Sequence, residues 1–186
     1  MPKPTTTNKR VLKELNTQLK THQEELAAVN KAAGISDHLT VKLTTNQAHF
    51  KRTETRDGEN KNFGIFYLQI DVTAKAATIY IPISIASGKK PTGFLYHIEG
   101  TAAGSIGTAD IKCRGESMTE VTIGTIQFAK IPPKTTATFT IQVTMEGKRA
   151  KVYTINLPRI NYKLSLNAAR YMTYTKELRS RSLTLV

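Results

Sequence analysis

The chain reads Thr135-Thr-Ala-Thr-Phe-Thr-Ile-Gln-Val-Thr-Met145, in which every second side chain from Ala137 onward is apolar. A period of two places these apolar side chains on one face of a β-strand and the polar ones on the other. Thr78–Ala86 has the same pattern, with isoleucine at positions 79, 81, 83 and 85. The two stretches predict a β-rich body whose strands bury one face.

Alternating or apolar stretches between turn residues predict further strands over most of the chain. Asp57-Gly58 predicts a hairpin turn, and Pro82, which has no amide hydrogen, predicts a sheet edge or a bulge. Eight or nine strands at this spacing predict an antiparallel sandwich of the Ig-like or jelly-roll type. The further strands are predicted at Leu39–Thr45, Ala48–Arg56, Asn62–Val72, Phe94–Glu99, Thr108–Cys113, Val121–Phe128 and Ala150–Leu157.

Three parts of the sequence carry a resemblance to a known family: Ile131–Thr144, the pair Phe66–Ala74 and Ala77–Pro82, and Val152–Tyr162. Their strand patterning resembles that of immunoglobulin-like modules in bacterial surface proteins, a fold that also occurs on phage virions. The likeness extends over about residues 40–162. It implies an Ig-like sandwich used for display, adhesion or spacing, without shared catalytic residues.

Before Gly34 the apolar period changes from two to alternating steps of three and four. This a/d heptad pattern predicts a helix over residues 8–34, capped by Asn8 and closed by Gly34. Because the stripe is narrow, it favours another helix as its partner and predicts a homo-oligomer; helix orientation and copy number stay open. The oligomerisation residues are Leu12, Leu15, Leu19, His22, Leu26 and Val29.

The sequence predicts four parts: a flexible basic arm (1–7), the helix (8–34), a β-sandwich (35–165) and a basic C-terminal segment (166–186). Within or beside the last part, Asn161–Leu166 suits one more strand and Ala168–Leu178 a short helix. Arg179–Val186 alternates again, and we expect it to pair with its own sheet rather than with a neighbour's.

The net charge is +13, and the residues from 148 onward hold nine Lys/Arg against Glu177 alone. So concentrated a charge favours an acidic partner, which is nucleic acid, an anionic surface or an acidic subunit, although a solvated tail is the alternative. The candidate contacts with nucleic acid or an acidic partner are Lys3, Lys9, Arg10, Arg170, Lys176, Arg179 and Arg181.

No motif in the sequence suggests catalysis, a metal site or a cofactor. The four histidines show no metal-ligand spacing, and the glycines in Gly100–Gly107 lie between strands without a following Gly-Lys-Ser/Thr. Cys113 beside Arg114 is either a thiol of lowered pKa or, as we favour, a small core residue. Neither a secretion signal nor a membrane span is predicted.

These observations favour a non-enzymatic structural protein, namely a virion component such as a coat, decoration or fibre-base protein. It would assemble through the helix with copies of itself and with other structural proteins. Two alternatives stay open: an Ig-like adhesion module exposed on a bacterial surface or secreted, and a basic protein that binds nucleic acid.

Overall fold

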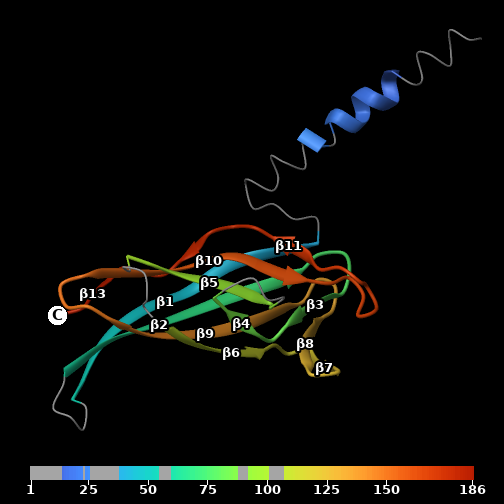
Figure 1. The fold of residues 1–186 in the computed structure, drawn as a ribbon. Helices are drawn as coiled ribbons and strands as arrows, with labels where there is room; N and C mark the ends of the chain where they lie inside the picture. Colours follow the sequence, from blue (N-terminus) through green and yellow to red (C-terminus); the bar gives the residue numbers. More distant parts are fainter. Residues whose placement is uncertain (1–13, 23, 26–37, 55–59, 88–91, 101–106) are drawn as a thin grey trace, which may run out of the picture.

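The computed structural model describes residues 14–22, 24–25, 38–54, 60–87, 92–100 and 107–186. Residues 14–22 and 24–25 are helical, and most of the other described residues lie in strands (Figure 1). The prediction of a mainly β protein with antiparallel sheets and one helix is confirmed. The predicted arm, the caps at Asn8 and Gly34, and the Asp57-Gly58 turn lie outside the described residues. The strands are β1 (Leu39–Glu54), β2 (Asn60–Ala74), β3 (Ile79–Pro82), β4 (Ile85–Ala86), β5 (Phe94–Glu99), β6 (Gly107–Arg114), β7 (Thr119–Ile123), β8 (Ile126–Ile131), β9 (Thr136–Gly147), β10 (Val152–Tyr162), β11 (Met172–Tyr174), β12 (Leu178–Arg179) and β13 (Leu183–Thr184).

The strands form three sheets. The first has the order β1-β2-β9-β6 and is antiparallel throughout. The second is built on β10, which pairs with β5, β11, β12 and β13; β4 adds a parallel pair to β5. The third, smaller sheet has the order β3-β8-β7. Since β9 belongs to the first sheet and β10 to the second, the chain changes sheet between them.

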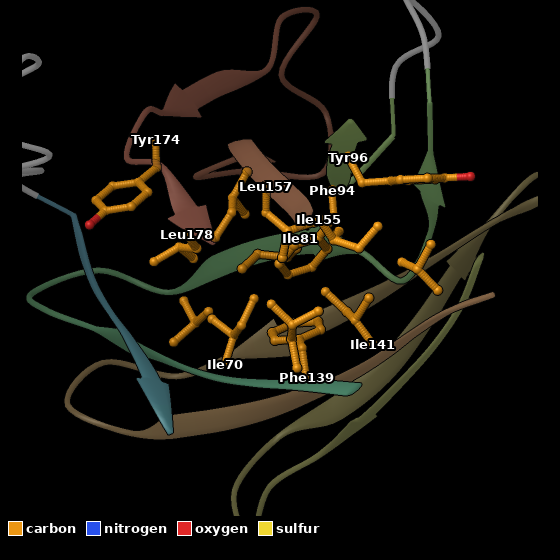
Figure 2. Close-up of a cluster of buried hydrophobic side chains, with 14 of the residues drawn as sticks. Ile70, Ile81, Phe94, Tyr96, Phe139, Ile141, Ile155, Leu157, Tyr174 and Leu178 are labelled. Atoms are coloured by element: carbon orange, nitrogen blue, oxygen red, sulfur yellow. The ribbon is translucent and has the colours of Figure 1, made fainter. Parts of the chain in front are cut away.

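The core lies between the first sheet and the sheet built on β10 (Figure 2). On β9, the alternating residues of the opening sequence are buried as predicted, and Phe139 and Ile141 are fully inaccessible. Phe94 on β5 meets Phe139 across the core, with ring centroids 4.9 Å apart and planes tilted by 53°. Such an aromatic contact contributes about 0.5–1.5 kcal/mol beyond the burial of the two rings.

The strands predicted at Leu39–Thr45 and Ala48–Arg56 form a single strand, β1. β1 continues through Thr45 and Asn46, where the register with β2 shifts between Leu43 and Thr45. A β-bulge places one extra residue in β1 at this point. The strand therefore continues, while its inward-facing positions change from odd to even residue numbers. The flanks of the predicted hairpin do pair, from Glu54 with Asn60 onward.

Two other predicted strands are each divided. Thr78–Ala86 breaks after Pro82, so that β3 lies at the edge of the third sheet while β4 joins the second. Val121–Phe128 is a hairpin instead of a strand, because Gly124 adopts a φ of +60° and turns the chain between β7 and β8. Apolar residues alternate on each side of this turn, but Ile123 and Ile126 are three residues apart, a break in phase that the prediction of one strand overlooks.

The prediction of a short helix at Ala168–Leu178 is wrong. Met172–Tyr174 and Leu178–Arg179 are short strands paired with β10, and Tyr174 and Leu178 are buried in the core. Asn161–Leu166 is not a separate strand either, since β10 continues only to Tyr162. The prediction that the final segment pairs with its own sheet is confirmed by β12 and β13.

Candidate functional site

The described part of the helix exposes the predicted oligomerisation stripe. Leu15 and Leu19 lie one turn apart, with 55% and 57% of their surface exposed. His22 follows on the same face, and its Nδ1 lies 2.8 Å from the carbonyl oxygen of Gln18. Because all described helical residues are exposed, no described part of the chain covers this face. The other stripe residues, Leu12, Leu26 and Val29, lie outside the described residues.

The predicted anion contacts of the C-terminal segment are all exposed, but Arg179 is already paired. Its Nη2 lies 2.9 Å from Glu177 Oε2 and 3.4 Å from Glu99 Oε1. Arg170, Lys176 and Arg181 form no ion pair with the described residues, so their charges face solvent. Lys3, Lys9 and Arg10 lie outside the described residues.

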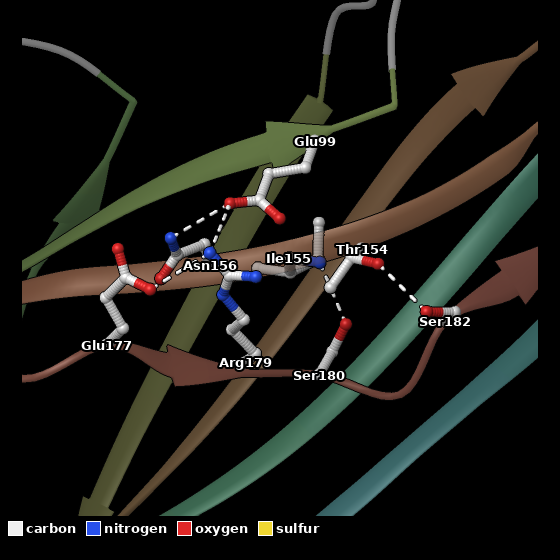
Figure 3. Close-up of polar contacts among 8 residues, drawn as sticks. All are labelled: Glu99, Thr154, Ile155, Asn156, Glu177, Arg179, Ser180 and Ser182. Atoms are coloured by element: carbon white, nitrogen blue, oxygen red, sulfur yellow. Dashed lines mark hydrogen bonds and ion pairs between the residues drawn. The ribbon is translucent and has the colours of Figure 1, made fainter.

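Arg179 belongs to a polar cluster that joins the C-terminal segment to β5 and β10 (Figure 3). Glu99 Oε1 also accepts a hydrogen bond of 3.0 Å from Asn156 Nδ2. Asn156 is only 5% exposed, and its Oδ1 has no hydrogen-bond partner among the residues that the structure describes. Since the side chains of Arg179 and Glu177 are more than half exposed, their ion pair contributes only about 0–1 kcal/mol. The cluster therefore orients the segment more than it stabilises it.

Two further side chains hold the same segment between the sheets. Ser180 Oγ accepts a hydrogen bond from Ile155 N of β10, and Ser180 N donates to Ile155 O, both at 2.8 Å. From β1, Asn46 Nδ2 donates to the carbonyl of Arg179 at 2.9 Å, and Arg181 N donates to Asn46 Oδ1 at 2.6 Å. Residues 179–181 thus connect β1 of the first sheet to β10 of the second.

The environment of Cys113 does not suit a nucleophile. Burial, with a smaller contribution from Glu120, raises the pKa of its thiol to about 12, and a backbone hydrogen bond from Arg114 opposes this only in part. Among the described residues, no group of three or more His, Cys, Asp or Glu side chains is placed to hold a metal ion. The rings of His38 and His49 lie beside Tyr162 and Tyr67, at 6.2 and 5.9 Å between centroids.

The structure also brings together basic residues that the site prediction did not select. Lys148, Arg149 and Lys151 occupy the turn between β9 and β10 and are exposed. The charge count from residue 148 onward includes them, but the predicted contacts of the C-terminal segment lie further along, at residues 170–181. The missing information was tertiary, because only the fold places this turn beside the C-terminal strand and the ends of β1 and β2.

Within the described part of the chain, no helix has both the length and the apolar character that crossing a membrane requires. Comparisons with models of protein families, with curated proteins and with solved structures found no match to this chain.

Proposed function

We propose that this chain is a non-enzymatic structural protein of a virion, such as a coat, decoration or fibre-base protein. In this proposal it assembles with its own copies and with other structural proteins through the N-terminal helix. The β body, an Ig-like or jelly-roll-type sandwich, is the part that is displayed. The observation that carries the proposal is the exposed pair Leu15 and Leu19.

The physical argument for assembly is the cost of leaving this stripe in water. Burying a leucine side chain contributes about 1.5–3 kcal/mol, and both leucines are more than half exposed in the single chain. They occupy consecutive core positions of a heptad pattern, which fits the groove of one other helix. A second copy of the chain supplies an identical stripe.

The outward face of the first sheet supports a displayed body. Thr138, Thr140 and Thr144 of β9 alternate with the buried core residues and point away from them. An antiparallel sheet with one polar face is typical of a layer that faces water. Ile65 and Tyr67 of β2, which pair with Thr144 and Gln142, add apolar surface to this face, so its polar character is strongest along β9.

The assembly test compares two double variants of the full chain by size-exclusion chromatography with light scattering. We expect L15A/L19A to be monomeric at concentrations where the unchanged chain is oligomeric. Alanine favours the helix but removes the leucine side chains of the oligomerisation stripe. The matched control T17A/T21A changes the opposite side of the helix and should stay oligomeric. An unchanged chain that is monomeric at high micromolar concentration would show that the assembly role is wrong.

The virion assignment has its own test in the genome. We expect the gene to lie among genes for capsid or tail proteins. A neighbourhood of cell-surface genes would contradict the assignment while leaving helix-mediated assembly untouched.

A further inference from the structure

The turn between β9 and β10 concentrates positive charge. Lys148, Arg149 and Lys151 surround Ala150, all four residues are exposed, and no described carboxylate forms an ion pair with the three cations. Cations so close in the sequence repel one another through Coulomb forces. A bound anion would turn this repulsion into attraction.

Backbone contacts hold this turn in one conformation. Lys148 N donates to the hydroxyl of the buried Tyr153 at 2.7 Å, and Ala150 N donates to Leu185 O at 2.6 Å. Leu185 N in turn donates to Lys151 O at 3.1 Å. Ala150 has a φ of +59°, a left-handed conformation that is strained for a residue other than glycine. A turn already constrained in this way loses little conformational entropy when it binds a ligand.

The register of the first sheet adds two basic residues at the same end. Arg52 of β1 pairs with Asn62 of β2, which pairs with Gly147 immediately before the turn. Lys61 neighbours Asn62, and its Nζ lies 3.2 Å from Glu146 Oε2. Adjacent strands lie about 4.8 Å apart, so the backbones of Arg52 and Lys61 lie within about two strand spacings of Gly147, with their side chains on opposite faces of the sheet. Figure 1 shows this turn, in orange, beside the C-terminus.

We infer that the basic end, defined as Arg52, Lys61, Lys148, Arg149 and Lys151, binds the sugar–phosphate backbone of a nucleic acid. Its cations lie on an exposed turn and on strand ends, and Glu54 and Glu146 offset them only in part. Such a protruding, multiply charged surface suits a long polyanion. It belongs to the β body, so the inference does not depend on helix-mediated assembly.

The apolar residues beside the turn argue against a membrane as the partner. Val152 and Val186 are 51% and 63% exposed, but neither offers the aromatic ring or long side chain that anchors a protein at a lipid interface. Contact through phosphates alone predicts binding that is insensitive to sequence and strongly dependent on salt.

The test measures binding of the full chain to a short labelled duplex DNA by fluorescence anisotropy over a range of salt concentrations. We expect K148Q/R149Q/K151Q to weaken binding about tenfold or more at low salt, and to reduce the slope of log K against log salt by about 2–3. The matched control K42Q/K112Q/R114Q removes the same residue types and the same charge from the outer face of the first sheet. It should change affinity less than about threefold.

Both variants are made in the chain and in the L15A/L19A background, so that a loss of assembly is not mistaken for a loss of contacts. If the triple variant unfolds by circular dichroism, R149Q alone should still lower the slope by about 1. Equal losses in the basic-end and control variants would overturn the inference, because net charge alone would then explain binding. So would a lack of DNA binding at low salt, or binding that depends on the basic end only with phosphatidylserine vesicles.

Discussion

Three turn residues with a left-handed backbone illustrate how single positions shape this protein. Gly124 has a φ of +60° in open space, so it serves only to reverse the chain between β7 and β8. Lys134 has the same φ, and its amide donates to Ala74 O at 2.8 Å, which attaches the turn before β9 to the end of β2. Ala150 does the same for the turn before β10 by donating to Leu185. In the two non-glycine cases a hydrogen bond across the fold offsets the local strain.

At the same scale, Cys113 yields a prediction about pH. Because burial raises the pKa of its thiol to about 12, the thiolate remains scarce in the folded chain at neutral pH. We expect its reaction with an aromatic disulfide reagent to be slow at neutral pH and to keep rising with pH beyond 9. The unfolded chain in urea is the control, and its rate should level off near the ordinary pKa of 9.0.

The raised pKa of Cys113 also predicts how the free energy of unfolding changes with pH. Between pH 9 and 12 the unfolded chain loses the thiol proton while the folded chain retains it, so the unfolded state binds fewer protons. The thiol's contribution to the free energy of unfolding is therefore complete below pH 9 and falls as the pH rises towards 12. A reaction rate that levels off below pH 9 in the folded chain would contradict this environment.

At the scale of elements, β9 organises the first sheet because it pairs along its whole length. It lies between β2 and β6, and its pairs with β2 run from Asn62–Gly147 to Thr73–Thr136. The side chains of β2 and β6 therefore alternate between the inner and the outer face in register with those of β9. The C-terminal strands are the opposite case, since β12 and β13 have only two residues each and depend on side-chain contacts.

Asn46 provides the element-scale prediction. Asn46→Ala removes both hydrogen bonds between β1 and the backbone of residues 179–181. We expect a loss of about 1–3 kcal/mol in the free energy of unfolding in urea, and faster amide exchange at Arg181. The neighbouring Gln47→Ala is the control and should change stability by less than about 0.5 kcal/mol. Unchanged exchange at Arg181 in the Asn46 variant would rule out this connection.

At the scale of the whole molecule, the buried residues form one cluster that extends from Leu39 to Leu185. Leu185, the residue after β13, is part of this core, because Gly147 leaves the space that Leu185 occupies: a Cβ at Gly147 would lie 2.5 Å from Leu185 Cδ1. A continuous core predicts that the β body unfolds in one cooperative step.

Leu185 and Val186 test this directly. Leu185 is fully buried, so Leu185→Ala should lower the free energy of unfolding by about 2–5 kcal/mol without changing the dependence on urea concentration. Val186 is its exposed neighbour, and Val186→Ala should have an effect below about 0.5 kcal/mol. Equal effects, or a separate early transition in the Leu185 variant, would mean that the C-terminal end of the chain is not part of the core.

The sequence by itself determined the β class, the buried faces of strands such as β9, and the leucine stripe of the helix, because side-chain period is a local property. It misread the segments whose state depends on distant partners. Tyr174 and Leu178 show spacing that suits a helix, yet burial against β10 makes their segment extended.

Only the tertiary structure decided which charges are free. Arg179, selected from the sequence, is paired with Glu99 and Glu177, whereas the cations of the Lys148–Lys151 turn form no ion pair with the described residues, and the turn lies beside Leu185. Charge is visible in a sequence, but its compensation depends on residues brought close by strand pairing. That pairing is set by burial of the whole core, which no local pattern contains.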